Sequence, residues 1–186
     1  KNEGKKNQQK FNSKQKTSNF SQDPHQIGII KKAFQFHSEG NLLEAAKYYQ
    51  YFLDQGYVDS RVLSNYGAIY RQKGQIDRAI ELFEQSIRLF PNSPEAYSNL
   101  GNIFKDQGKL QEAELLINKS IVLNSDIADS HFNLGNILRD LGKVKEAELS
   151  IAKAIKINPN HLEAHNNLGS LFKEAAKFDD AEKLFL

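Results

Sequence analysis

The side chains best suited to binding chemistry in this sequence are amides that recur at a fixed interval. The asparagines of this evenly spaced series are Asn65, Asn99, Asn133 and Asn167. Asn102 and Asn136 each follow one of them by three positions, so both series share one face of a helix. An amide side chain offers an acceptor oxygen and two N–H donors, which match the C=O and N–H groups of a peptide bond. The pattern predicts a surface that holds the main chain of a polypeptide.

Spacing supports this interpretation but leaves a second one open. Packed helices lie about 8–10 Å apart, and an extended chain advances about 3.3–3.6 Å per residue. Asparagines on neighbouring helices would therefore meet every second or third residue of a bound peptide. Duplication of a repeat would also preserve an asparagine that only lies on the surface or forms a hydrogen bond within its own repeat. The sequence does not choose between these roles.

A row of cations continues the same helical face. Three residues after the repeat position that Asn102 occupies, a basic side chain recurs in successive units: Arg71, Lys105, Arg139 and Lys173. Positive charge beside the amides favours a polypeptide whose bound segment has acidic flanks.

Other candidate sites fail on spacing or context. His161 and His165 are four positions apart, as zinc-binding histidines on a helix can be, but His165 takes a position that large side chains fill in other units, which favours packing. Gly108-Lys109 and Gly142-Lys143 lack the Ser or Thr and the preceding strand of a phosphate-binding loop. The chain has no cysteine, and no Ser, His and acid grouping stands out. We expect no catalytic residue, metal or cofactor here.

Charge is distributed unevenly along the chain. Residues 1–22 hold six lysines and one glutamate, so the remainder is mildly acidic although the net charge is +2. An acidic body argues against binding of nucleic acid, which requires a basic face. The first residues lack the apolar core of a secretory signal, and no apolar run reaches the length of about 18 residues that a membrane span needs. We therefore expect no membrane span and a cytoplasmic location by default.

Glycines set the period of the elements that must position these side chains. The glycines of one series, spaced at the same interval as the asparagines, are Gly40, Gly74, Gly108 and Gly142. Each separates two segments in which apolar residues recur every three to four positions, as on an amphipathic helix. A left-handed glycine ends a helix, and proline separates one unit from the next. A fixed period of about 34 residues is typical of a stacked helix–turn–helix array, in which each unit is stabilised by its neighbours.

These residues resemble the tetratricopeptide repeat (TPR) family, which has small residues at positions 8, 20 and 27 of its unit and aromatic residues at positions 11 and 24. The unit that begins at Ser60 supplies Gly67, Tyr70, Ala79, Phe83 and Ser86 at these positions. Other units begin near residues 26, 94, 128 and 162. The resemblance implies an all-α, right-handed superhelix (an α-solenoid of helix–turn–helix repeats). It also implies that the first helix of each unit lines a concave groove, which would contain the asparagines and the cations.

The asparagine series is also similar to the TPR arm of the O-linked N-acetylglucosamine transferase family, especially at Ala164-His165-Asn166-Asn167-Leu168-Gly169. This implies a scaffold that holds an extended protein or peptide segment in its groove. The alternative is the substrate-selecting N-terminal arm of a larger enzyme, such as a glycosyltransferase, with catalysis outside this chain. The sequence does not match the TPR clamp that binds acidic chaperone tails. That clamp needs Lys and Arg in its third repeat, whereas in every register the third repeat here has an acidic residue and Asn, as at Glu95 and Asn99.

The two ends of the sequence carry separate expectations. Residues 1–25 have few large apolar side chains, so we expect a disordered basic leader before the array of residues 26–186. The fifth unit, with Gly169 and Ala181 in register, would be truncated within its second helix at Phe185 and Leu186. We therefore expect the natural protein to continue. The exposed apolar end could also stack on a second copy, which predicts end-to-end self-association.

Overall fold

The structure, a computed structural model, describes the backbone of residues 23–184 and the side chains through residue 174 and at Ala176. The predicted leader falls almost wholly on residues 1–22, outside the described part, as do Phe185 and Leu186 at the predicted self-association end.

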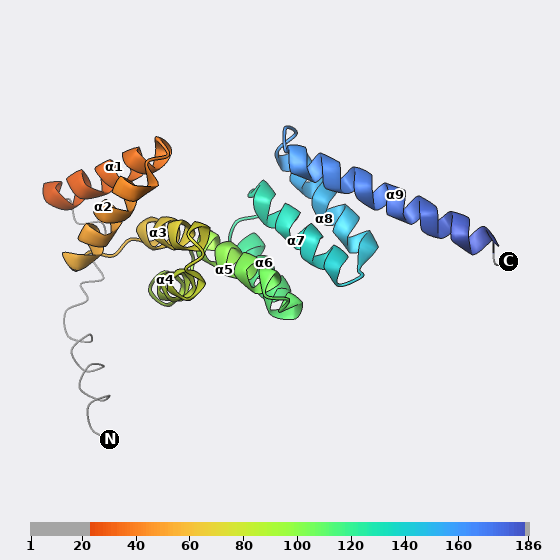
Figure 1. Cartoon of the computed structure of the whole chain (residues 1–186), viewed down its shortest axis with the longest axis horizontal. Coiled ribbons are helices and arrows are strands. Elements are labelled where there is room, and N and C mark those ends of the chain that lie inside the picture. Colours follow the sequence, from red (N-terminus) through yellow and green to blue (C-terminus); the bar gives the residue numbers. More distant parts are fainter. Residues whose placement is uncertain (1–22, 185–186) are drawn as a thin grey trace, which may run out of the picture. The chain divides into compact units, whose positions relative to one another are not determined.

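Residues 23–184 form nine α-helices and no strand (Figure 1), which confirms the predicted all-α class. The helices are α1 (Pro24–Ser38), α2 (Leu42–Asp54), α3 (Ser60–Gln72), α4 (Ile76–Leu89), α5 (Pro94–Asp106), α6 (Leu110–Leu123), α7 (Ala128–Asp140), α8 (Val144–Ile157) and α9 (Leu162–Leu184). None of these helices is long and apolar enough to cross a membrane.

The chain divides within α4 into two compact units, one ending at Leu82 and the other beginning at Phe83. In the first unit, α1 packs on α2 and α2 on α3 around a core that includes Ala45, Tyr49 and Phe52. In the second unit, α5 pairs with α6 and α7 with α8, and α6 and α8 each also contact the helix that follows. Its core contains Ile117 and Ile151.

Glycine closes the turn within each of the first four helical pairs. Gly142 has a φ of 76°, a left-handed conformation that side chains rarely adopt. Its N–H donates to the carbonyl of Arg139, and the N–H of Lys143 donates to the carbonyl of Leu138. These two bonds form a Schellman motif, which satisfies carbonyls that the end of α7 would otherwise leave unpaired. The turn reverses the chain and lets α8 pack back on α7.

Two other glycines allow paired helices to cross closely. A Cβ atom on Gly135 would lie 2.4 Å from Cγ1 of Ile151, and one on Gly101 would lie 2.9 Å from Cγ1 and Cδ1 of Ile117. Both isoleucines are completely buried. Their side chains therefore fill the space that a side chain on the facing first helix would need, which fixes how α7 meets α8 and how α5 meets α6.

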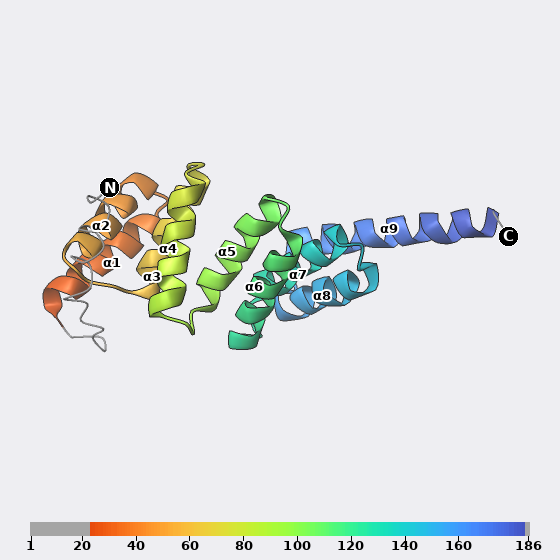
Figure 2. The same ribbon diagram turned by 90° about the horizontal axis from the view of Figure 1, so that it is seen from below.

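The fifth unit differs from its sequence-based expectation. Instead of two helices joined by a turn, residues 162–184 form the single helix α9, which runs past the end of α8 in Figures 1 and 2. Ala176 stands where the earlier units have their left-handed glycine, and alanine is the strongest helix former. Gly169 accordingly has no described atom within 4 Å of the place where its Cβ would be, whereas the corresponding Gly135 is covered by Ile151.

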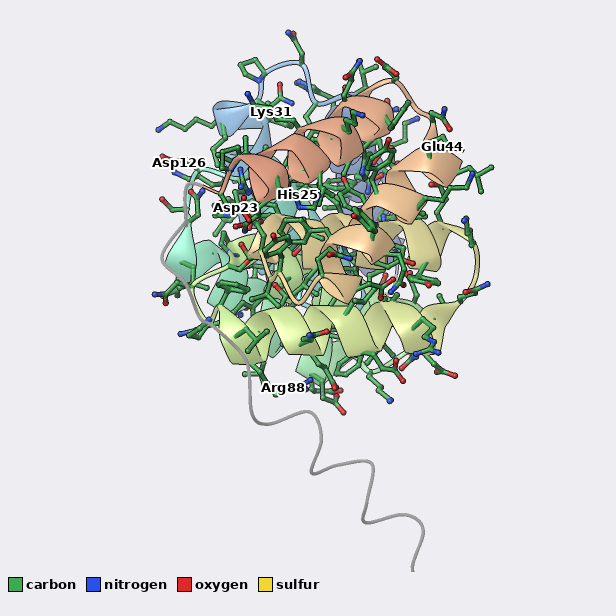
Figure 3. The ribbon with its side chains drawn as sticks, turned by 90° about the vertical axis from the view of Figure 1, so that its left-hand side faces the viewer. Asp23, His25, Lys31, Glu44, Arg88 and Asp126 are labelled. Carbon is green, nitrogen blue, oxygen red and sulfur yellow. The ribbon has the colours of Figure 1, made fainter. Side chains whose placement is uncertain are left out.

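The first helix has a strong start signal that its sequence explains. The carboxylate of Asp23 accepts a hydrogen bond from the backbone N–H of His25, and Pro24 occupies the first helical position. Figure 3 shows Asp23 and His25 together at this end of α1. The hydroxyl of Tyr57 donates to the same carboxylate at 2.7 Å, which lowers the pKa of Asp23 and ties α1 to the segment that follows α2.

Candidate functional site

One pocket of the second unit contains three of the six predicted asparagines. Its volume is about 400 Å³, and it opens between α5, α7 and the start of α9, the first helices of three consecutive repeats. The pocket is lined by Glu95, Ser98, Asn99, Asn102, Ile127, Asp129, Ser130, Phe132, Asn133, His161 and Glu163. We call it the amide pocket. The fold therefore brings Asn99, Asn102 and Asn133 together, although they lie on two different helices.

The remaining asparagines of the second unit bond to each other. Nδ2 of Asn167 donates to Oδ1 of Asn136 at 2.7 Å, and Asn136 is buried. This bond joins α7 to α9 and satisfies an amide that would otherwise be buried without a partner. For Asn136 and Asn167 the structural interpretation of the asparagine series is therefore the better one.

The equivalent pair one repeat earlier does not make this bond. Asn102 and Asn133 are the counterparts of Asn136 and Asn167, respectively, in the preceding repeat. Yet Oδ1 of Asn102 is buried and has no hydrogen-bond partner among the described residues. A buried acceptor left unpaired destabilises a fold by about 1–3 kcal/mol. The amide pocket thus opens beside an amide pair that lacks the bond joining Asn136 to Asn167, and one of its lining residues has a buried acceptor without a partner among the described residues.

His161 supplies a second buried polar atom to the pocket. Its side chain is only 10% exposed, and its Nδ1 accepts a hydrogen bond from the N–H of Ala164 at 3.3 Å. A neutral ring that accepts at Nδ1 carries its proton on Nε2. Nε2 lies 3.2 Å from Oδ1 of Asp129 but makes no aligned hydrogen bond. The ring stacks against Phe132 with centroids 4.8 Å apart, which holds this donor at the pocket wall.

Charge in the pocket is negative. Glu95, Asp129 and Glu163 recur at the interval of the repeat, each at the second position of its helix, and all three line the pocket. No lysine or arginine is among the described residues that line it.

The predicted cations lie elsewhere. Nζ of Lys105 is 3.5 Å from Oδ1 of Asp106, and Nε of Arg139 is 3.8 Å from Oδ1 of Asp140. Lys173 is exposed on α9. These residues occupy the last turns of α5 and α7 and the middle of α9, away from the residues that line the pocket.

In the first unit, Asn65 belongs to a network of side chains. Its Nδ2 donates to the hydroxyl of Tyr49 at 3.3 Å, and that hydroxyl lies 2.9 Å from Nδ1 of His37. Burial raises the pKa of Tyr49 to about 12, so the hydroxyl remains protonated at neutral pH. Asn65 thus helps to join α3 to α2, while Arg71 lies half-buried in the last turn of α3.

The histidines do not form a metal site in the part of the chain that the structure describes, where no group of three metal-ligating side chains occurs. His165 does not take the predicted packing role, because its ring is exposed. Its Nε2 lies 2.9 Å from the carbonyl of Pro159. This contact fixes the turn before α9 and leaves His161 alone at the pocket.

Models of known protein families match the repeating part of the chain. Models of the TPR repeat match residues 67–108, 94–127 and 128–161, and together they span residues 67–161 without a gap. The chain belongs to the tetratricopeptide repeat family. A search of curated proteins finds no significant match. The TPR units matched within residues 94–161 contain α5 to α8, and with them most of the amide pocket.

Solved TPR structures resemble the chain over most of its length. A structure of MamA is 25% identical with a TM-score of 0.65, and the match covers 82% of this chain and 90% of that one. The first TPR domain of Spaghetti (RPAP3), solved with the HSP90 peptide SRMEEVD, is 26% identical with a TM-score of 0.60, covering 64% and 97%. An O-GlcNAc transferase from Thermobaculum terrenum has 23% identity and a TM-score of 0.58, covering 60% of this chain but 22% of that one.

The last of these similarities concerns the fold alone. Taken together, the comparisons identify the chain as a TPR scaffold similar to a TPR domain that was solved with a bound peptide. The three acidic residues of the pocket recur with the TPR period, so the repeat pattern of the sequence already carried a signal for them. His161 gave no such signal, because its importance depends on burial.

Proposed function

We propose that this TPR protein is a non-catalytic scaffold that binds an extended polypeptide segment across the first helices of its second unit. The observation that carries the proposal is the interrupted amide pair. Asn102 lines a pocket together with Asn99 and Asn133, and its side-chain oxygen is buried without a hydrogen-bond partner among the described residues. A peptide N–H would satisfy that oxygen, and the amides of Asn99 and Asn133 have the donors and acceptors that pair with a peptide backbone.

The contacts between helices support a segment that runs across α5 and α7. These two first helices contact each other directly within the second unit. At the usual spacing of about 8–10 Å between packed helices, their asparagines would meet residues two or three apart on an extended strand. Such binding addresses the main chain, so we expect it to tolerate varied sequences. Arg71, Lys105, Arg139 and Lys173 remain a secondary prediction for charged flanks of the ligand.

Selection from a random peptide library tests the proposal without requiring a known ligand. Phage that display random linear peptides are selected on the full chain, and the enriched peptides are synthesised with a fluorescent label. Their dissociation constants are then measured by fluorescence anisotropy with the wild type and with an Asn99→Ala/Asn133→Ala variant. Loss of two net hydrogen bonds at about 0.5–1.5 kcal/mol each predicts affinity weakened by roughly fivefold to 150-fold.

A matched control separates pocket asparagines from asparagines in general. Asn118 and Asn166 are exposed on α6 and α9 and do not line the pocket, so Asn118→Ala/Asn166→Ala should bind as the wild type does. Because no hydrogen bond among the described side chains depends on Asn99 or Asn133, circular dichroism should show both variants folded. Equal affinity of the pocket variant and the control variant would remove the support for this site.

A further inference from the structure

A cationic side chain on the bound polypeptide fits the pocket best. This inference rests on the proposed function and specifies its ligand. We infer that the amide pocket takes the guanidinium group of an arginine, held by the carboxylates of Glu95, Asp129 and Glu163 and by the unpaired oxygen of Asn102. The ligand is thus a polypeptide with arginine in the segment that crosses α5 and α7.

The pocket keeps a net negative charge after the helix dipoles are counted. The pocket lies at the N-termini of α5, α7 and α9, and each terminus contributes roughly half a positive elementary charge. A full carboxylate charge at each terminus exceeds this, so the site stays net negative. Since no lysine or arginine is among its described lining residues, nothing with a fixed positive charge balances the remainder.

Several acceptors of the pocket also have few or no hydrogen-bond partners. Asp129 has an 80% exposed side chain, so its oxygens are open to a ligand. Glu95 accepts one long hydrogen bond from the hydroxyl of Ser93, at 3.3 Å, through Oε2. Oδ1 of Asn102 and Nε2 of His161 are buried without hydrogen bonds to the described residues. Nε2 of His161 has the carboxylate of Asp129 at 3.2 Å, whereas the Asn102 oxygen lacks a donor, which a guanidinium would supply.

Arginine suits this arrangement better than lysine. A guanidinium has five N–H donors fixed in one plane, whereas an ammonium is a compact point charge. The acceptors here come from three separate helices, so a donor set spread in several directions can reach more of them. Phe132 and the ring of His161 form part of the same wall, and a guanidinium also stacks on aromatic faces. The peptide backbone beside the guanidinium has a C=O group for Nε2 of His161.

Four synthetic probes test the inference with the full chain. Dye-labelled peptides of glycine and serine carry arginine, lysine, citrulline or glutamate at the centre, and their affinities are measured by fluorescence anisotropy. Citrulline has nearly the shape of arginine without its charge, so it isolates the electrostatic contribution. We expect arginine to bind about tenfold tighter than citrulline, which corresponds to about 1.4 kcal/mol, and lysine to fall between them. Higher salt should reduce the difference.

The matched variants change the same number of charges in two places. Glu95→Gln/Asp129→Asn/Glu163→Gln removes the pocket carboxylates and should abolish the preference for arginine. The control Asp77→Asn/Glu112→Gln/Glu146→Gln removes acidic residues from the first turns of α4, α6 and α8, which do not line the pocket, and should retain the preference.

Several results would overturn the inference. They are equal affinity for arginine and citrulline, equal affinity for arginine and lysine, tighter binding of glutamate, or an arginine preference that survives loss of the pocket carboxylates. Binding that depends on Asn99 and Asn133 but not on the central residue would reject only the arginine assignment. If none of the four peptides binds and the library yields none either, the proposed function fails as well.

Discussion

A graded series of glycine substitutions tests how closely the helices of each repeat cross. Gly135→Ala places a Cβ 2.4 Å from Cγ1 of Ile151 and 3.2 Å from the carbonyl oxygen of Ala147, a backbone atom that cannot easily move. Overpacking of this kind destabilises a core by about 1–3 kcal/mol, which outweighs the gain of about 0.5–1 kcal/mol from replacing a helical glycine by alanine. We expect a net loss of roughly 1–2 kcal/mol.

Gly169→Ala should have the opposite effect, because no described atom lies within 4 Å of the new Cβ. Only the gain in helix propensity remains, so the variant should be more stable by about 0.5–1 kcal/mol. Gly101→Ala should fall between the two, since its closest contacts, with Cγ1 and Cδ1 of Ile117, are longer, at 2.9 Å.

Urea unfolding followed by circular dichroism in the far ultraviolet measures all three variants against the wild type. The expected order of unfolding free energy places Gly169→Ala above the wild type and Gly135→Ala lowest. A neutral or stabilising Gly135→Ala would refute the close crossing of α7 and α8. A destabilising Gly169→Ala would indicate that a second helix covers this glycine in solution, and the account of α9 as one helix would then be wrong.

Three further perturbations probe other parts of the structure. Ala176→Gly should weaken α9 by about 1 kcal/mol at its centre, and hydrogen exchange should show faster exchange there, whereas unchanged exchange would contradict the role given to Ala176. Asn136→Ala should reduce the unfolding free energy by about 0.5–1.5 kcal/mol, because it removes the hydrogen bond to the half-buried amide of Asn167, while Asn102→Ala should have a much smaller effect on urea unfolding. Burial lowers the pKa of His37 below its ordinary 6.5, so the unfolded chain binds a proton more readily than the folded chain. The neutral, buried His37 therefore contributes its full stability above pH 6.5, and this contribution is lost as the pH falls through the lower pKa of the folded state. Urea unfolding at pH 7.5 and 5.5 should show this decline, and it should shrink in His37→Gln; a decline unaffected by that change would assign it to other groups.

Much of the fold followed from the sequence because its signals are local and repeat. Gly40, Gly74, Gly108 and Gly142 marked the helix turns, and each has a φ between 73° and 76° in the structure. The same logic explains the error in the fifth unit. A match to Ala181 in register suggested a second helix, but the turn depended on a glycine that Ala176 replaces. The lack of a glycine at position 176 predicts the single helix α9 better than the repeat pattern does.

The site was less predictable, because its character depends on which hydrogen bonds form. Asn102 and Asn136 hold equivalent positions in their units and look identical in the sequence. In the structure one has a buried oxygen without a partner among the described residues, and the other accepts a hydrogen bond from Asn167. That difference arises from the placement of neighbouring helices. His161 likewise became part of the site only through burial against Phe132, which no spacing rule predicts.

The side-chain NH₂ signals of the asparagines provide the most direct test of the account. In ¹⁵N-labelled full chain, these signals can be followed while a peptide selected from the library is added. If the peptide binds in the amide pocket, the signals of Asn99, Asn102 and Asn133 should shift and saturate together, while those of Asn136 and Asn167 remain in place because their bond is already formed. Shifts confined to Asn136 and Asn167, or to residues outside the amide pocket, would contradict it.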